Sequence, residues 1–127
     1  MRRWLIVIAV LLSISIVVLW QTSKGKENQT LQGIYLMAFE RSDFYPNVEV
    51  CPPSGTRYWL DPASIPNLRA QLATLTVDQA HALAYQAVYL RFVGDISNRG
   101  QYGHLGQYWR EVQVKRILEI KKIDSCQ

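Results

Sequence analysis

An apolar segment near the N-terminus constrains this chain more than any other feature. It runs from Trp4 to Trp20 and is interrupted only by Ser13 and Ser15, whose hydroxyls can bond back to helix carbonyls. A run of about 17 residues is at the short end of what crosses a bilayer as a helix. The run has no polar face, which disfavours a buried core helix. We therefore expect residues 1–20 to form an N-terminal transmembrane helix.

The residues that flank this segment predict its orientation and its fate. Arg2 and Arg3 precede it, and the positive-inside tendency keeps them in the cytoplasm and exports the remainder. A cleaved signal peptide should end in small residues, whereas residues 17–22 read VVLWQT. We expect an uncleaved signal anchor in a bacterial inner membrane, single-pass, with the C-terminal domain in the periplasm. Cleavage and release into the periplasm is the alternative, and a lipoprotein is disfavoured because no cysteine follows the run closely.

The exported part divides into a polar stretch and a domain. Residues 21–32 are almost entirely polar, which predicts a flexible tether. Residues 33–127 then form a domain of about 95 residues, enough for one compact core. Without Arg2 and Arg3 the net charge falls from +4 to about +2, so we see no electrostatic footprint for nucleic acid or anionic lipid.

Three short strands are predicted in the first part of the domain. The first lies at residues 33–40 and ends at a polar break at 41–43. The second, at 44–51, contains Pro46 and is therefore short, bulged or at an edge. A turn rich in proline and glycine leads to the third, at 56–60.

A helix and two longer strands follow. Thr76 is a candidate N-cap for an amphipathic helix from Val77 to Gln86 or Ala87. Residues 88–96 alternate between apolar and polar, which predicts a strand with Val88, Leu90, Phe92 and Ile96 on one face and Tyr89, Arg91 and Asp95 on the other. Residues 97–107 contain three glycines and form the loop that we expect to be most mobile.

The last strand is predicted at 108–123. Its apolar residues share one parity, and they are Val112, Val114, Leu118 and Ile120. Arg116 interrupts this parity, which a bulge or a strong bend would explain. Three strands, a helix and two strands is the order of the OB-fold. We expect a mainly β (α+β) domain, a five-stranded OB-like barrel with one capping helix.

The chain also resembles the C-terminal OB domain of the NlpE-type envelope lipoproteins. The resemblance spans Gly33 to Cys126 and is carried by Gly33, Tyr35, Cys51, Gly55, Arg57, Trp59, Val88, Leu90, Gly94, Val112, Val114, Ile117, Leu118, Ile120 and Cys126. That family has a lipidated N-terminus and a separate N-terminal barrel with a Cys-x-x-Cys pair, and this chain has neither. A role in copper handling or stress sensing therefore does not carry over.

The resemblance implies that Cys51 and Cys126 form a disulfide. Export to an oxidising compartment permits the bond, which would close a loop of about 75 residues and stabilise the fold by about 4 kcal/mol. Two free thiols, or a bond to another protein, are the alternatives. Neither cysteine lies beside a histidine, so a metal site is not indicated.

No enzyme motif, metal-binding motif or cofactor motif is present. His81 and His104 lie in no catalytic spacing, and the carboxylates are scattered. If the domain binds a ligand, loop residues and outward strand residues rich in Tyr, Trp and Arg are the usual contacts, and here these are Arg57, Tyr58, Tyr89, Arg91, Arg99, Tyr102, His104, Tyr108, Trp109 and Arg110.

The leading hypothesis is a membrane-anchored periplasmic OB-fold binding module, not an enzyme, whose partner is another envelope protein. The membrane contact is made through residues 4–20, and no nucleic acid partner is expected. The alternatives are a module that binds a glycan, a cell-wall fragment or a small ligand, and a periplasmic immunity or inhibitor protein.

Overall fold

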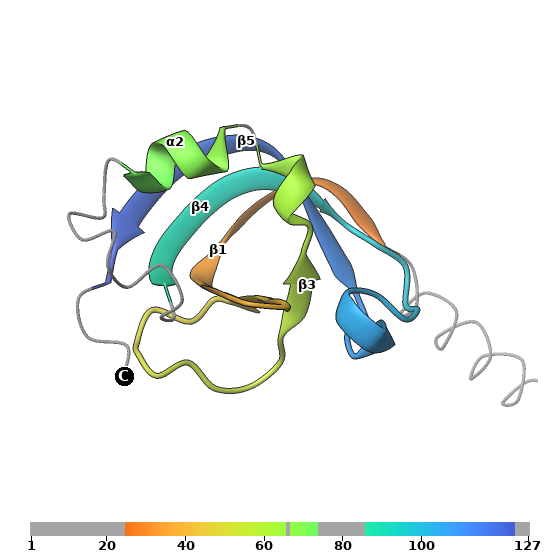
Figure 1. Cartoon of the computed structure of the whole chain (residues 1–127). Helices are drawn as coiled ribbons and strands as arrows, with labels where there is room; N and C mark the ends of the chain where they lie inside the picture. Colours follow the sequence, from red (N-terminus) through yellow and green to blue (C-terminus); the bar gives the residue numbers. More distant parts are fainter. Residues whose placement is uncertain (1–24, 66, 74–85, 124–127) are drawn as a thin grey trace, which may run out of the picture.

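The computed structural model describes residues 25–65, 67–73 and 86–123. This part is mainly β (Figure 1), with strands β1 (Lys26–Ala38), β2 (Arg41–Pro46), β3 (Tyr58–Leu60), β4 (Gln86–Ile96) and β5 (Glu111–Lys122). The helical elements are short: η1 (Pro62–Ser64), α2 (Leu68–Ala73) and η3 (His104–Gly106). Among the described residues, no helix is long and apolar enough to span a bilayer. The predicted transmembrane segment, residues 1–20, lies outside this part.

The five strands form one sheet that closes into a ring. Their order is β1, β2, β3, β5, β4, and β4 returns to β1. All pairs are antiparallel except β3 with β5, which runs parallel through Trp59↔Glu111 and Leu60↔Val112. β1 is long and curved (Figure 1), so it pairs with β2 through Gly33–Ala38 and with β4 through Lys26–Met37. The predicted mainly β domain with five strands is confirmed.

The core fills the inside of the ring. Phe44 and Phe92 meet edge to face, with 5.2 Å between ring centroids, and Ile65 and Leu68 extend the same cluster from the helical connection. Burial of each such side chain stabilises the fold by about 1.5–3 kcal/mol. The predicted alternation of the fourth strand is confirmed, because Val88, Leu90 and Phe92 are buried in this cluster and Ile96 packs against it.

The β4–β5 pairing contains two irregularities that turn the sheet. The register shifts between Arg91 and Phe92 and again between Val93 and Gly94. Each shift leaves one extra residue on β5, as the predicted bulge requires. The apolar parity is therefore not preserved along β5: Ile117 and Ile120 pack against the core, whereas Leu118 is exposed. The expectation that Leu118 shares the face of Val112 was wrong.

Several predicted boundaries need correction. The tether was expected to reach residue 32, but Lys26–Gln32 already belong to β1, because pairing with β4 compensates for their low hydrophobicity. The polar residues 41–43 begin β2 rather than interrupt the sheet. The third strand begins at Tyr58 and the last at Glu111, later than expected.

The predicted second strand and capping helix also change. β2 ends at Pro46, so residues 47–51 are not strand. Most of the predicted helix lies outside the described residues, but Gln86 and Ala87, placed at its end, are the first residues of β4.

Candidate functional site on the outer face of β2 and β3

A buried aspartate lies on the outer face of β2. Ser42 and Phe44 face the inside of the ring, where the Ser42 hydroxyl lies 3.0 Å from the Tyr35 hydroxyl and donates to the Leu60 carbonyl. Since strand residues alternate between faces, Arg41 and Asp43 point outward. Asp43 nevertheless has no exposed surface. Other side chains must therefore cover it.

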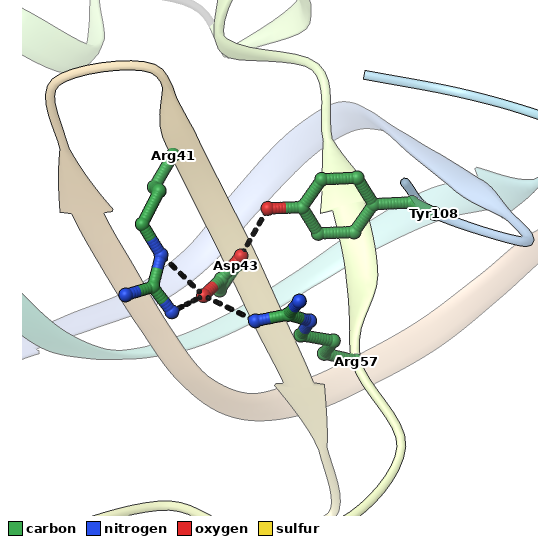
Figure 2. Close-up of polar contacts among 4 residues, drawn as sticks. All are labelled: Arg41, Asp43, Arg57 and Tyr108. Carbon is green, nitrogen blue, oxygen red and sulfur yellow. Dashed lines mark hydrogen bonds and ion pairs between the residues drawn. The ribbon is translucent and has the colours of Figure 1, made fainter. Parts of the chain in front are cut away.

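Two arginines and a tyrosine enclose the Asp43 carboxylate (Figure 2). Oδ2 accepts from Arg41 through Nε at 3.1 Å and through Nη2, and also lies 3.5 Å from Nη1 of Arg57. Oδ1 accepts a hydrogen bond from the Tyr108 hydroxyl. A carboxylate removed from water needs such charged and hydrogen-bonding partners to offset its loss of hydration. The cluster joins β2, the segment before β3 and the β4–β5 loop.

Tyr108 is buried and covers one side of this cluster. Only 3% of its surface is exposed, and burial, with the hydrogen bond to Asp43 next, raises the pKa of Tyr108 to about 12. Its ring lies 5.3 Å from that of Trp59 and 5.3 Å from the Arg57 guanidinium carbon. The neutral Tyr108 hydroxyl therefore donates its hydrogen bond to Asp43, and the Tyr108 ring packs against the Arg57 guanidinium.

The glycine-rich loop is held by hydrogen bonds between its own backbone groups and packs against Trp59 of β3. Tyr102 and Tyr108 exchange backbone hydrogen bonds of 2.9 and 3.2 Å across it, and the Gly100 amide donates to the Trp109 carbonyl at 3.0 Å. Gly103 lies so close to Trp59 that an added Cβ would be 2.5 Å from the indole. The expectation of a mobile loop receives no support from these contacts.

The tip of the β1–β2 hairpin meets this loop at the surface. Nε2 of His104 lies 3.4 Å from Oε2 of Glu40. The residues beside this contact, Phe39 and Leu105, are apolar, and each is 79% exposed. Exposed apolar groups that gather at one place mark an interaction surface more often than scattered ones do. We call this surface the hairpin–loop face and define it as Phe39, Glu40, Arg41, Arg57, Trp59, His104 and Leu105.

The structure brings together only some of the ligand residues expected from the sequence. Arg57, Tyr108 and His104 belong to the site or its support. Tyr58 packs against the core, and Tyr102 is held within the loop, where its hydroxyl donates to the Asn98 carbonyl at 3.0 Å.

The other predicted residues lie apart from the Asp43 cluster. Tyr89 and Arg91 are on β4, where Lys121 lies over the Tyr89 ring. Arg99 lies 5.6 Å from the Trp109 ring centroid, and Arg110 donates to the Ser97 carbonyl at 2.6 Å.

Sequence reasoning missed Phe39, Glu40, Arg41, Asp43, Trp59 and Leu105. The pattern Arg41-x-Asp43 carries a signal, since it places two opposite charges on one face of a strand. Nothing in the local sequence connects it to Tyr108, which is 65 residues away.

A concave region lies at the base of the β4–β5 loop, apart from the hairpin–loop face. This cavity of about 280 Å³ is lined by Gly25, Glu27, Asp95, Ile96, Ser97, Asn98, Glu111 and Gln113. Its Asp95 already has partners: Lys115 Nζ at 2.8 Å and the Asn28 amide at 2.7 Å, which lower the pKa of Asp95. Within the described ranges, no group of three His, Cys, Asp or Glu residues is arranged to hold a metal ion.

Cys51 lies in the connection between β2 and β3, half-buried. Its predicted partner, Cys126, and the other histidine, His81, lie outside the described residues, so the disulfide stays a prediction. No protein-family model, curated protein or solved structure matches the chain.

Proposed function

We propose that this chain is a non-catalytic, OB-like binding module that holds another envelope protein on its hairpin–loop face. The observation that carries the proposal is the exposure of both Phe39 and Leu105, each of which is next in sequence to one of the two residues of the Glu40–His104 contact. Trp59 and Arg57 lie on the same face, and Trp and Arg are enriched among the residues that dominate protein interfaces.

The strand arrangement supports an OB-like assignment. OB barrels bind their ligands on the face of strands two and three and on the loops that flank it. In this chain the corresponding elements are β2, β3, the β1–β2 hairpin and the β4–β5 loop, which together carry the hairpin–loop face. The site and the strand order are thus consistent with one another.

The groups of the site support binding rather than catalysis. Asp43 is enclosed by Arg41, Arg57 and Tyr108, so its carboxylate is not presented to a substrate as a base or nucleophile would be. His104 lies at the surface against Glu40. A protein partner would instead contact the exposed side chains of Phe39 and Leu105 and the exposed edge of the Arg57 guanidinium.

The anchor supports an envelope location. Trp4–Trp20 with Arg2 and Arg3 before it favours a single-pass inner-membrane protein with residues 25–123 in the periplasm. We propose that Cys51 and Cys126 form a disulfide there, which would fasten the C-terminus to the β2–β3 connection.

Site-specific photo-crosslinking in intact bacteria tests the proposed function. A photoreactive amino acid is placed at position 39 or 105 of the full chain, and at position 116 as the control, because Arg116 is exposed on β5 outside the face. We expect one envelope protein to be crosslinked from 39 and from 105 and not from 116. Equal products from all three positions, or none from 39 and 105, would contradict the proposal.

One observation favours a glycan as a second candidate ligand. Trp109 is 67% exposed, and an exposed indole can stack against a sugar ring. Loss of binding to isolated cell-wall fragments on Trp109→Ala, with Phe39→Ser unaffected, would favour this candidate over the protein partner.

A further inference from the structure

We propose that the hairpin–loop face recognises a single carboxylate of the partner, flanked by apolar side chains, and that Arg57 is the residue that receives it. This inference rests on the proposed function and specifies the chemistry of the partner. It joins two observations: a guanidinium that is fixed in place without using most of its donors, and exposed apolar residues on the same face.

The hydrogen bonding of Arg57 is incomplete within the described part of the chain. A guanidinium has five N–H donors, and here one of them, on Nη1, reaches an acceptor, Asp43 Oδ2 at 3.5 Å. That oxygen is shared with the shorter contacts of Arg41. Arg57 remains 40% exposed. Its outward edge can therefore form paired hydrogen bonds with a second carboxylate.

The orientation of Arg57 is set before any partner arrives. The Arg57 guanidinium carbon lies 5.3 Å from the centroid of the Tyr108 ring, and the Tyr108 hydroxyl donates to Asp43, the counter-ion of Arg57 (Figure 2). A side chain that is already ordered loses less entropy on binding.

The surroundings of Arg57 favour a protein carboxylate over a polyanion. Glu40, half-exposed, lies on the same face and would repel the dense charge of a nucleic acid or an anionic membrane. Phe39 and Leu105 offer exposed apolar surface, which a sugar-phosphate chain has no apolar groups to cover. A segment with one Asp, Glu or C-terminal carboxylate between apolar residues fits both features.

The test uses two short probes and the full chain in zwitterionic detergent. The probes are the blocked peptides Phe-Glu-Leu and Phe-Gln-Leu, which differ only in the charge. Binding is followed by NMR at the Arg57 Nε–H and the Trp59 indole N–H. We expect the glutamate probe to bind about tenfold more tightly than the glutamine probe, with the largest shifts at these two groups. Salt raised from about 0.05 M to about 0.5 M should reduce the difference several-fold.

Two variants complete the test. Arg57→Gln should abolish the preference for the glutamate probe, and Arg91→Gln, at an exposed arginine of β4, should keep it. Equal affinities for the two probes in the wild-type chain, or a preference that survives Arg57→Gln, would overturn the inference. Crosslinking from positions 39 and 105 does not depend on the partner's charge. It therefore tests the proposed function independently of the carboxylate inference.

Discussion

At the scale of single residues, the Tyr108–Asp43 contact links stability to pH. The pKa of Tyr108 is raised to about 12, from an ordinary value of 10.0, because burial and Asp43 both disfavour the phenolate. Below pH 10 the hydroxyl is protonated in both states and its contribution is complete. Between about pH 10 and 12 the unfolded chain loses this proton and the folded chain keeps it. Stability must therefore fall as the pH rises through that interval.

We predict that the free energy of unfolding of the full chain decreases between about pH 10 and 11 by up to 1.4 kcal/mol for each tyrosine that behaves this way. Urea unfolding in detergent, followed by tryptophan fluorescence, measures it. Tyr108→Phe should be less stable by about 1–2 kcal/mol at neutral pH, since Asp43 loses a donor, and should show a shallower alkaline decrease. Some decrease should remain because burial also raises the pKa of Tyr35. An unchanged pH slope in Tyr108→Phe would contradict this assignment.

At the scale of elements, the β4–β5 loop depends on two glycines in different surroundings. Gly103 has φ +68° and an added Cβ would lie 2.5 Å from Trp59 and 2.8 Å from Tyr108. Gly106 has φ +65°, but its nearest neighbour would be the flexible Gln101 side chain, at 3.3 Å. Both positions disfavour a side chain through the backbone, and only Gly103 also disfavours it through packing.

We predict that Gly103→Ala destabilises the chain by about 3 kcal/mol and Gly106→Ala by about 1 kcal/mol. The Gly103 variant should also change the fluorescence of Trp59, since the loop must withdraw from the indole. Thermal unfolding of the two variants in parallel provides the comparison. Equal losses would mean that the loop does not pack on Trp59 as described.

The bulges of β5 separate two leucines that the sequence pattern treats alike. Leu90 is fully buried, whereas Leu118 is 38% exposed because the register shifts turn it outward. We predict that Leu90→Ala costs about 2–5 kcal/mol and Leu118→Ala less than about 1 kcal/mol. Chemical denaturation of both variants measures the difference. A large loss of stability in Leu118→Ala would mean that Leu118 is buried, as the unbroken alternation expected from the sequence requires.

At the scale of the whole molecule, local pattern predicts strands better than it predicts the site. The alternation from Val88 to Ile96 requires only neighbouring residues, and β4 forms as expected. Lys26–Gln32 have no such pattern, and they are strand only because β4 lies beside them. The face of Leu118 depends on bulges whose positions are set by the partner strand.

The site depends on contacts that no local pattern contains. Asp43 is buried because Arg57 and Tyr108 reach it from 14 and 65 residues away. The hairpin–loop face exists because Glu40 and His104 bring two loops together. Arg57, His104 and Tyr108 could be predicted as site residues from their residue type alone. Phe39 and Leu105 could not, because their place in the site depends on how the two loops meet in the fold.

Binding through the hairpin–loop face can be tested by measuring how much of the crosslinked partner the full chain captures once the exposed apolar residues are changed. Phe39→Ser combined with Leu105→Ser removes the apolar part of the hairpin–loop face, and Val50→Ser, at an exposed position of the β2–β3 connection, is the matched control. All three positions are exposed, so each change should alter stability by less than about 0.5 kcal/mol. We expect at least about a tenfold loss of partner capture in the double variant and wild-type capture in Val50→Ser. Equal capture by the two variants would contradict it.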